Sequence, residues 1–500
     1  PARSRGRVRG IGVAMNIGKL GLPYNSGKSI LRSVTDLAFD TRRHGVDDGA
    51  SDLFSPAWFR RRGDRPALVF DDPQWGARDV RAITYAELAD RIDMRRIELG
   101  RERRLLLLDA VDDTEAAITL FAALAGRHCL LIGGDGRNRA ELIERYQPDS
   151  IVTDHGSGDC VGVEYPTPWR HDSRHDLHPD LALLMSTSGT TGGAKLVRLS
   201  RDAVLSNALA IGAALGLTAD DRAITSLPFH YCFGMSVVTS HIAAGGSVVV
   251  TDTSVVDPCF WALADQQRVS TLAGVPYTFE MIERRGLDTM RVPSLRLVTQ
   301  AGGRMAPDAV ERFVAAGADA GWDFVVMYGQ TEATARMAIS TPADTAANPA
   351  SVGRAIPGGV LRIEPHASVG DPDVGEVVYS GPNVMMGYAT GPADLRRGHD
   401  LDALHTGDLG RFDGSGRLEL VGRANRFVKL HGKRVDLDHL AEQLSSPGGP
   451  VRCFGGDDGL VAVISDDGEH DRLDPDLAAR ARALVDVPPA RVVAARLTDT

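Results

Sequence analysis

Short apolar runs alternate with alanine-rich segments along most of this 500-residue chain, and this alternation is the strongest constraint on its fold. Leu105–Leu108 and Leu181–Met185 have the length and composition of buried strands, whereas Thr114–Ala125 and Arg201–Leu215 have the length of helices. Strands that alternate with helices form parallel sheets with helices packed on their faces. From about residue 66 onward we therefore predict a doubly wound α/β fold.

The remaining predicted elements follow from the same reasoning. The other strands are Cys129–Ile132, Ser247–Val250, Leu295–Thr299 and Phe324–Met327, and the other helices are Tyr85–Arg95 and Ala309–Ala318. After Ser351 the chain changes to strand-like pieces punctuated by glycine and proline, which are Val360–Glu364, Gly375–Tyr379 and Arg417–Val421. This pattern predicts a compact β-rich subdomain in the form of a distorted β-barrel.

A chain of this length, with 43% apolar residues, can bury more than one core. We predict a large N-terminal domain over residues 1–422, built from two doubly wound sheets and the β-barrel subdomain. Its arginine- and glycine-rich first 50 or so residues would form a peripheral arm. The stretch Gly422–Gly432 is rich in charge and glycine, which predicts a hinge. Residues 423–500 would then be a small, mobile α+β domain.

Composition argues against several classes of partner. With 56 basic and 66 acidic residues, the net charge of −10 disfavours nucleic acid. No apolar run reaches the roughly 18 residues of a membrane span, and no apolar signal core follows the basic N-terminus, so we expect no membrane association and a cytoplasmic location. The five cysteines are widely spaced, which predicts reduced, buried thiols.

The segment Ser186–Lys195 is rich in serine, threonine and glycine, and it follows a predicted buried strand and precedes a predicted helix. Open α/β sheets bind ligands at such turns. Glycine lets backbone N–H groups face an anion, the hydroxyls add donors, and Lys195 adds positive charge, so the segment suits a polyphosphate. A solvated Gly/Ser turn would have the same composition.

Four later segments strengthen the polyphosphate interpretation. Tyr328–Glu332 ends a strand with a glycine turn, a hydroxyl and a carboxylate, which suit a phosphate oxygen and Mg²⁺. His405–Asp408 offers a carboxylate to two ribose hydroxyls, Ala301–Gly303 allows close approach to a flat ring, and Gly422–Arg423 offers an arginine to ribose or phosphate. A helix N-cap and ordinary turns are the plain alternatives.

In order and spacing, these segments resemble the adenylate-forming superfamily of acyl-CoA synthetases, firefly luciferase and peptide-synthetase adenylation domains. The resemblance extends from about residue 66 to the end of the chain. It implies ATP-dependent activation of a carboxylic acid to an acyl-AMP with release of pyrophosphate, followed by acyl transfer to a thiol. The implied cofactors are ATP, Mg²⁺ and coenzyme A.

The resemblance also assigns roles to individual residues. The phosphate loop would comprise Thr187, Ser188, Gly189, Thr190, Thr191, Gly192 and Lys195. The nucleotide and metal contacts would be Gly302, Gly303, Met327, Tyr328 and Gly329 around adenine, Thr331 at the α-phosphate, Glu332 on magnesium, and Asp408 and Arg423 at ribose and phosphate. Lys429 and Gly432 would face the pantetheine arm, and Asn425 would be the hinge residue.

The segment Pro228–Met235 resembles the family's aromatic gate, and His230 would border the acyl carboxylate. Amino-acid-activating relatives place an aspartate soon after Phe233, and this chain has none there, so an ammonium group would be left uncompensated. We therefore predict an acid without an α-amino group. The pocket wall would be apolar, which suits an aryl, fatty or polycyclic acid. Its predicted members are Phe233, Gly274, Val275, Pro276 and Met327, together with His230.

The sequence leaves two questions open, which are the identity of the acyl acceptor and whether all catalytic residues of the family are present. CoA is favoured as the acceptor, and a carrier-protein phosphopantetheine arm or another partner is the alternative. The chain departs from the family at Gly193–Leu196, which lacks the usual proline and glycine around the lysine, and at Asn425, where Asp or Lys is usual.

The family's C-terminal glycine–lysine pair also has no counterpart, because no lysine follows Lys433. Either the chain stops short of that pair or the protein naturally lacks it. The alternative from another functional class is a homologue that binds ATP and does not catalyse a reaction.

Overall fold

A computed structural model gives the structure of the protein. It describes residues 52–71, 80–109, 113–133, 139–154, 161–164, 173–186, 195–366, 369, 371–423, 427–430, 433–445, 451–455, 461–465, 477–485 and 492–494. The predicted N-terminal arm lies outside these ranges. Among the described residues, every helix is too short or too polar to span a bilayer.

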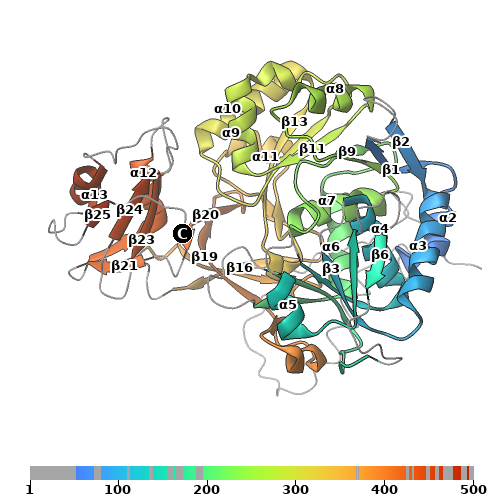
Figure 1. Cartoon of the computed structure of the whole chain (residues 1–500). Coiled ribbons are helices and arrows are strands. Elements are labelled where there is room, and N and C mark those ends of the chain that lie inside the picture. Colours follow the sequence, from blue (N-terminus) through green and yellow to red (C-terminus); the bar gives the residue numbers. More distant parts are fainter. Residues whose placement is uncertain are drawn as a thin grey trace, which may run out of the picture. The chain divides into compact units, whose positions relative to one another are not determined.

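The first large sheet has nine strands in the order β15-β14-β13-β12-β11-β9-β10-β1-β2. Its central strands pair in parallel, and antiparallel strands close both edges. Figure 1 labels β13, β11, β9, β1 and β2 of this sheet. The bounds are β1 Pro66–Asp71, β2 Val80–Thr84, β9 Arg222–Ile224, β10 Ser247–Val250, β11 Thr271–Gly274, β12 Leu297–Gln300, β13 Asp323–Tyr328, β14 Ala338–Ile339 and β15 Arg354–Ala355.

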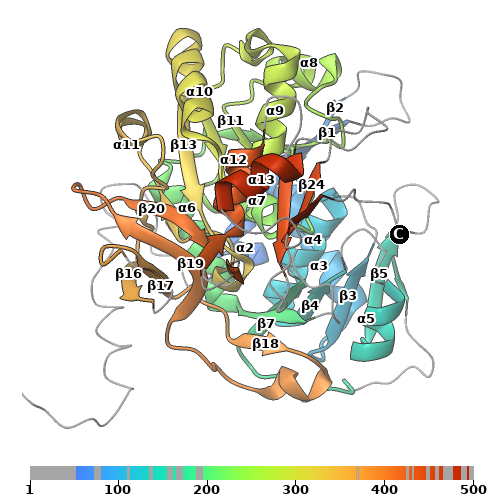
Figure 2. The same ribbon diagram turned by 90° about the vertical axis from the view of Figure 1, so that its left-hand side faces the viewer.

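The second large sheet has seven strands in the order β18-β8-β7-β4-β3-β5-β6. Figure 2 shows β7, β4, β3 and β5 side by side in this order, and these four pair in parallel. The bounds are β3 Leu105–Asp109, β4 Cys129–Ile132, β5 Ser150–Asp154, β6 Val161–Glu164, β7 Leu181–Ser186, β8 Leu196–Ser200 and β18 Gly387–Ala389.

Helices cover the two sheets and join them through a shared apolar core. The bounds are α2 Pro56–Arg60, α3 Tyr85–Leu99, α4 Asp113–Gly126, α5 Arg139–Tyr146, α6 Arg201–Ala214, α7 Cys232–Ala243, α8 Pro258–Gln266, α9 Pro276–Arg285, α10 Pro307–Ala320 and α11 Pro342–Ala347. The helix α7 packs on α6 and on β9 and β10, and α6 packs on β7 and β8. This helix pair therefore lies between the sheets.

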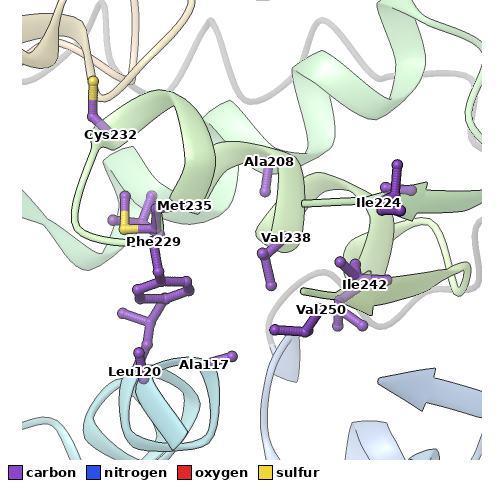
Figure 3. Packing of buried hydrophobic residues seen from close by; sticks show 14 of the residues in the cluster. Ala117, Leu120, Ala208, Ile224, Phe229, Cys232, Met235, Val238, Ile242 and Val250 are labelled. Carbon is purple, nitrogen blue, oxygen red and sulfur yellow. The ribbon is translucent and has the colours of Figure 1, made fainter. Parts of the chain in front are cut away.

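The interior of that interface is apolar on both helices. Figure 3 shows Phe229, just before α7, pointing toward Leu120 of α4, with Met235 beside it. Further along α7, Val238 and Ile242 belong to the same buried cluster as residues of both large sheets. Burying an apolar side chain of this size contributes about 1.5–3 kcal/mol, so this shared cluster is a main source of cohesion between the sheets.

The β-rich subdomain expected after Ser351 is a four-stranded antiparallel sheet in the order β16-β17-β19-β20. Its strands are β16 Val360–Pro365, β17 Gly375–Ser380, β19 Leu404–Phe412 and β20 Leu418–Arg423. Two of the expected strands match β16 and β17 closely, and the third begins one residue later than expected. The long strand β19 was not predicted, because its sequence contains the Gly-Asp pair of a turn.

The C-terminal segments form small elements with a core of their own. A hairpin joins β21 Phe427–Leu430 to β22 Lys433–Asp436, and a three-stranded sheet contains β23 Val451–Gly455, β24 Val461–Ser465 and β25 Val492–Ala494. Helices α12 Leu437–Leu444 and α13 Leu477–Val485 accompany them. The apolar residues of this segment form a separate cluster, which consists of Leu437, Leu440, Leu444, Val451, Cys453, Leu477 and Ala481.

Three predictions need correction. The segment after Ser186 leads into the strand β8, antiparallel to β7, before the helix starts, because Leu196–Ser200 is a fully buried run that contains Arg198. The strand expected at Leu295 begins two residues later, at Leu297. Finally, Cys259 is exposed near the start of α8, while Cys129, Cys232 and Cys453 are buried as expected and Cys160 lies outside the described residues.

The buried position of Arg198 in β8 predicts a large contribution of this side chain to stability. Its guanidinium is fully buried, pairs with Asp400, and donates to the carbonyl oxygens of Met386 at 2.9 Å and Tyr388 at 3.2 Å. Arg198→Ala would remove a buried charged donor from Asp400 and from these carbonyl oxygens, so we expect a loss of about 3–5 kcal/mol in the free energy of unfolding. Urea denaturation measures it.

The matched control is Arg291→Ala, which removes an exposed pair with Asp288 and should cost less than about 1 kcal/mol. Equal effects of the two substitutions would contradict the buried role of Arg198.

Candidate active site

Three adjacent parallel strands end at one edge of the nine-stranded sheet and place most of the predicted site there. The strand β11 ends at Gly274, β12 ends at Gln300, and β13 ends at Tyr328. Because β11, β12 and β13 run in parallel, the segments that follow them lie at the same edge, where open α/β sheets hold ligands. The predicted adenine and acyl residues are thereby brought together.

The glycines after these strands allow close backbone packing. A Cβ atom on Gly329 would lie 1.7 Å from the carbonyl oxygen of Ala335. At Gly302, which has a φ of +81°, a Cβ atom would lie 2.6 Å from the Tyr231 hydroxyl oxygen and 3.0 Å from Val275. Both positions therefore require glycine, and Gly302 is held against the predicted acyl wall.

Asp408 of β19 is the convergence point of the site. Its Oδ2 accepts hydrogen bonds from the Tyr328 hydroxyl and from Nε2 of Gln330 at 2.7 Å, and its Oδ1 accepts from Nε of Arg423 at 2.9 Å. The carboxylate is buried, whereas the Arg423 side chain is 59% exposed. The structure thus unites three of the segments singled out from sequence around one carboxylate.

The phenol of Tyr328 serves as a neutral donor to that carboxylate. Burial and then the charge of Asp408 raise the pKa of Tyr328 well above its usual value. Gln330 was not selected from sequence, although it lies inside the Tyr328–Glu332 segment, and it also donates to the carbonyl oxygen of Thr406 at 3.0 Å. This role of Gln330 depends on the approach of β19 to the turn that follows β13, which neither segment signals in the sequence.

Glu332 lies in a short 3₁₀ turn, Thr331–Ala333, directly after β13. Its Oε1 accepts a hydrogen bond from the Tyr388 hydroxyl at 2.8 Å, and Nζ of Lys195 lies 3.4 Å from the centre of the Tyr388 ring. Burial and then the charge of Glu332 raise the pKa of Tyr388. Lys195, Tyr388 and Glu332 therefore form a row in which a cation–π contact and a hydrogen bond link the lysine to the carboxylate.

The backbone after the turn is strained. Thr334 has a φ of +66°, which is rare for a β-branched residue, and its hydroxyl donates to the carbonyl oxygen of Asn383 at 2.8 Å. The side chain of Asn383 in turn donates to the carbonyl oxygens of Ala333 and Arg336, each at 2.8 Å. Such strain persists only where the surroundings hold it, and it concentrates at functional sites.

The donor set suits Mg²⁺ bound together with phosphates. Across the described ranges, no three or more His, Cys, Asp or Glu side chains form a metal-binding group. Glu332 nevertheless offers a carboxylate, and Mg²⁺ is commonly held by one or two carboxylates together with substrate phosphates. A single partly buried carboxylate, oriented by Tyr388, fits that pattern.

Three of the predicted acyl-pocket residues, Phe233, Val275 and Met327, share one apolar cluster. Phe233 and Met327 are buried in it, with Tyr231 and Val275 packed against them. Pro276 starts α9 beside Gly303, and Gly274 packs against Phe279. His230 is exposed at the entrance to α7. The Thr331 hydroxyl contacts the sulfur of Cys232, the residue before Phe233, at 3.2 Å.

Some predicted site residues lie outside the described ranges. They are Thr187, Ser188, Gly189, Thr190, Thr191, Gly192, Asn425 and Gly432. Lys429 belongs to β21, and only its backbone is described.

Comparison with known proteins identifies the family of this chain. The model of the AMP-binding enzyme family matches residues 110–389, which is more than half of the chain. The chain belongs to the AMP-binding enzyme family. The matched range of this AMP-binding enzyme includes β13, the turn with Glu332 and the strand with Tyr388, while Asp408 and Arg423 lie beyond it.

Curated relatives of this AMP-binding enzyme include indoleacetate–CoA ligase of Aromatoleum aromaticum, 34% identical over 51% of this chain and 49% of that protein. Oxalate–CoA ligase of Arabidopsis thaliana is 29% identical over 53% of this chain and 52% of that protein. The chain thus aligns with about half the length of these relatives.

Solved structures share the fold of this AMP-binding enzyme. The o-succinylbenzoate CoA synthetase from Bacillus subtilis, in complex with its acyl-adenylate intermediate, has a TM-score of 0.69 at 20% identity and covers 88% of this chain and 94% of its own. The same synthetase in complex with ATP and a magnesium ion also has a TM-score of 0.69, at 19% identity. At such identities the match establishes the fold, which is the predicted α/β architecture.

The close approach at Gly329 yields a prediction about stability. In Gly329→Ala the new methyl group would meet the Ala335 carbonyl, so the turn that carries Glu332 must shift, at a cost of about 3 kcal/mol or more. Thermal denaturation followed by circular dichroism measures the loss. Gly391→Ala is the control, since its φ of −173° is open to any residue and no atom lies within 4 Å of the added carbon. Indistinguishable melting curves would refute the required close approach.

Proposed function

We propose that this protein joins a non-amino carboxylic acid to AMP at the expense of ATP, releases pyrophosphate, and transfers the acyl group to the thiol of coenzyme A. The observation that carries the proposal is the convergence of Tyr328, Gln330 and Arg423 on Asp408, next to the turn that bears Glu332. Its membership of the AMP-binding family supports the same conclusion.

In this proposal Asp408 accepts hydrogen bonds from the ribose hydroxyls. A carboxylate has about four lone-pair sites, and the structure uses three of them for Tyr328, Gln330 and Arg423, all of which hold the carboxylate in one orientation. The ribose would exchange for one or more of these donors, and exposed Arg423 is the one that can swing away at least cost. Adenine would lie against Gly302, Gly303 and Tyr328.

The phosphates would lie between Thr331, Lys195 and the glycine-rich segment. A carboxylate oxygen of the acid attacks the α-phosphorus, the bond to the bridging oxygen breaks, and pyrophosphate leaves with that electron pair. Such transfers depend on positioning and on electrostatic stabilisation of the phosphates. Glu332 would hold Mg²⁺, which supplies positive charge to the phosphate oxygens. Tyr388 would fix the orientation of Glu332 through its hydrogen bond.

The apolar cluster of Phe233, Val275 and Met327 supports an acid with a largely apolar body. The names of the relatives, among them an indoleacetate–CoA ligase, support both a non-amino acid and CoA as acceptor. We further propose that residues 1–422 and 423–500 are separate domains and that the second rotates between the two half-reactions around Asn425. The separate apolar cluster of the C-terminal segment supports this division.

Acid-dependent exchange of labelled pyrophosphate into ATP, measured on the natural full-length protein, tests the first half-reaction. We expect exchange with apolar non-amino acids and none with α-amino acids. Glu332→Gln should lower the rate on the order of 100-fold because it removes the metal ligand's charge. Asp408→Asn should raise the KM for ATP roughly tenfold or more.

The control for these variants is Asp288→Asn, which alters an exposed carboxylate and should leave exchange unchanged. Absence of exchange with every acid in a broad panel would refute the proposed function.

The acceptor is tested separately by supplying preformed acyl-AMP. Formation of acyl-CoA from acyl-AMP and CoA, detected by mass spectrometry, is the expected result. Release of AMP only in the presence of a phosphopantetheinylated carrier protein would contradict CoA as the acceptor and leave the first half-reaction standing.

A further inference from the structure

A buried arginine lies at the inner wall of the proposed acyl pocket without a carboxylate partner. Arg336 is 3% exposed and follows the turn that carries Glu332. Its Nη1 donates to the carbonyl oxygen of Ala335 at 3.4 Å, its Nε approaches the sulfur of Met327 at 3.4 Å, and its Cζ lies 3.7 Å from the centre of the Phe233 ring. These are long or weak contacts for a guanidinium with five donors.

Two other buried arginines form ion pairs with carboxylates. Arg198 has Asp400, and Arg95 has both Glu98 and Glu115. In contrast, the titratable groups that face Arg336 are the Cys232 thiol and the Tyr231 hydroxyl, and the described residues place no carboxylate in an ion pair with it. Burial lowers the pKa of Arg336 to about 10, so the guanidinium still carries its charge at neutral pH.

Arg336 also borders empty space. A cavity of about 20 Å³ lies between α6, α7 and the strands β11 to β13, and its lining includes Arg336, Met327 and Thr299. A cavity of this size holds about one water molecule, or one oxygen atom of a ligand. Met327 both lines this cavity and belongs to the apolar cluster with Phe233 and Val275, so the cavity lies against the proposed acyl wall.

A buried charge without a counterion is costly, and the cost falls if a ligand supplies the counterion. We propose that Arg336 binds a second carboxylate on the substrate, so that the acid activated by this protein is a dicarboxylic acid with an apolar body between its two carboxyl groups. One carboxyl group reacts at Thr331, and the other forms a charge-assisted hydrogen bond with Arg336. The inference rests on the proposed function and names its substrate class.

Phe233 and Met327 then have a defined task. They hold the guanidinium plane by the ring contact and the sulfur contact, which leaves its other donors to serve a ligand in the cavity that Arg336 lines. The neutral thiol and phenol beside it do not compete for its charge, because burial raises the pKa of both Cys232 and Tyr231. Arg336 is in this view a specificity-determining residue.

The test compares pyrophosphate exchange for pairs of a monocarboxylic acid and the dicarboxylic acid of the same chain length, both aliphatic and aryl. Natural protein should prefer the dicarboxylic member by about tenfold or more in kcat/KM, the effect of one hydrogen bond to a charged group. In Arg336→Met, which keeps the length of the side chain and removes its charge, the ratio should fall to about one or below. Arg291→Met, which changes an exposed arginine, should retain the natural ratio.

Several outcomes would overturn the inference. One is a natural preference for monocarboxylic acids, and another is an Arg336→Met variant that loses exchange with both acids to the same extent, since that pattern indicates a packing role. Exchange with no preference between monocarboxylic and dicarboxylic acids would refute this inference alone. Absence of exchange with every acid would refute the proposed function.

Ligand-induced thermal stabilisation gives a second readout that does not need turnover. Dicarboxylic acids should raise the Tm of the natural protein more than their monocarboxylic partners do, and Arg336→Met should abolish the difference. Arg336→Lys, which keeps the charge, should restore part of it. Equal stabilisation by both members of each pair in the natural protein would overturn the inference even if no variant folds.

Discussion

The burial of the α6–α7 pair between the two large sheets is the constraint on which the rest of the structure depends. Apolar residues of α7 face β9 and β10, and those of α6 face the second sheet, so neither sheet can move without opening the shared core. The same packing fixes the first turn of α7. In that turn Cys232 contacts Thr331, and the ring of Phe233 packs against the guanidinium of Arg336. Core packing therefore determines the inner wall of the site.

The site gathers negative side chains around a place proposed for a polyanion, and each is compensated differently. Arg423 offsets the charge of Asp408, and two neutral donors, the Tyr328 hydroxyl and the Gln330 amide, contact its Oδ2. Among the described side chains, Glu332 accepts a hydrogen bond from the Tyr388 hydroxyl, and Lys195 lies against the Tyr388 ring. The described residues pair Asp408 with an arginine, whereas Glu332 forms no such ion pair there and its charge can still attract a cation. Two carboxylates at one sheet edge are thus suited to different tasks by their neighbours.

Sequence was most informative where function or packing depends on local pattern. The apolar runs of β4 and β10 matched their predicted bounds, because a short run of buried residues has few other uses. The glycine turns after β12 and β13 were recognisable because only glycine allows the backbone to approach so closely.

Long-range pairing was the part that sequence could not supply. Tyr388 lies 56 positions from Glu332 in the chain, and nothing in either segment signals the other. The strand β8 was missed because Arg198 interrupts an otherwise apolar run, and its partners are carbonyls from a distant segment. Nothing in the local sequence distinguishes Arg336 from an exposed arginine, although the structure buries it.

The antiparallel pairing of β7 with β8 has a consequence for the glycine-rich segment between them. Ser186 and Leu196 are register partners, so both ends of the segment meet at a single rung of the ladder. Loop-closure entropy rises only slowly with loop length, and an insertion or deletion between these two residues leaves every other rung in place. The register of the sheet therefore does not fix the length of this segment, and any constraint on its length comes from the ligand that it is proposed to bind.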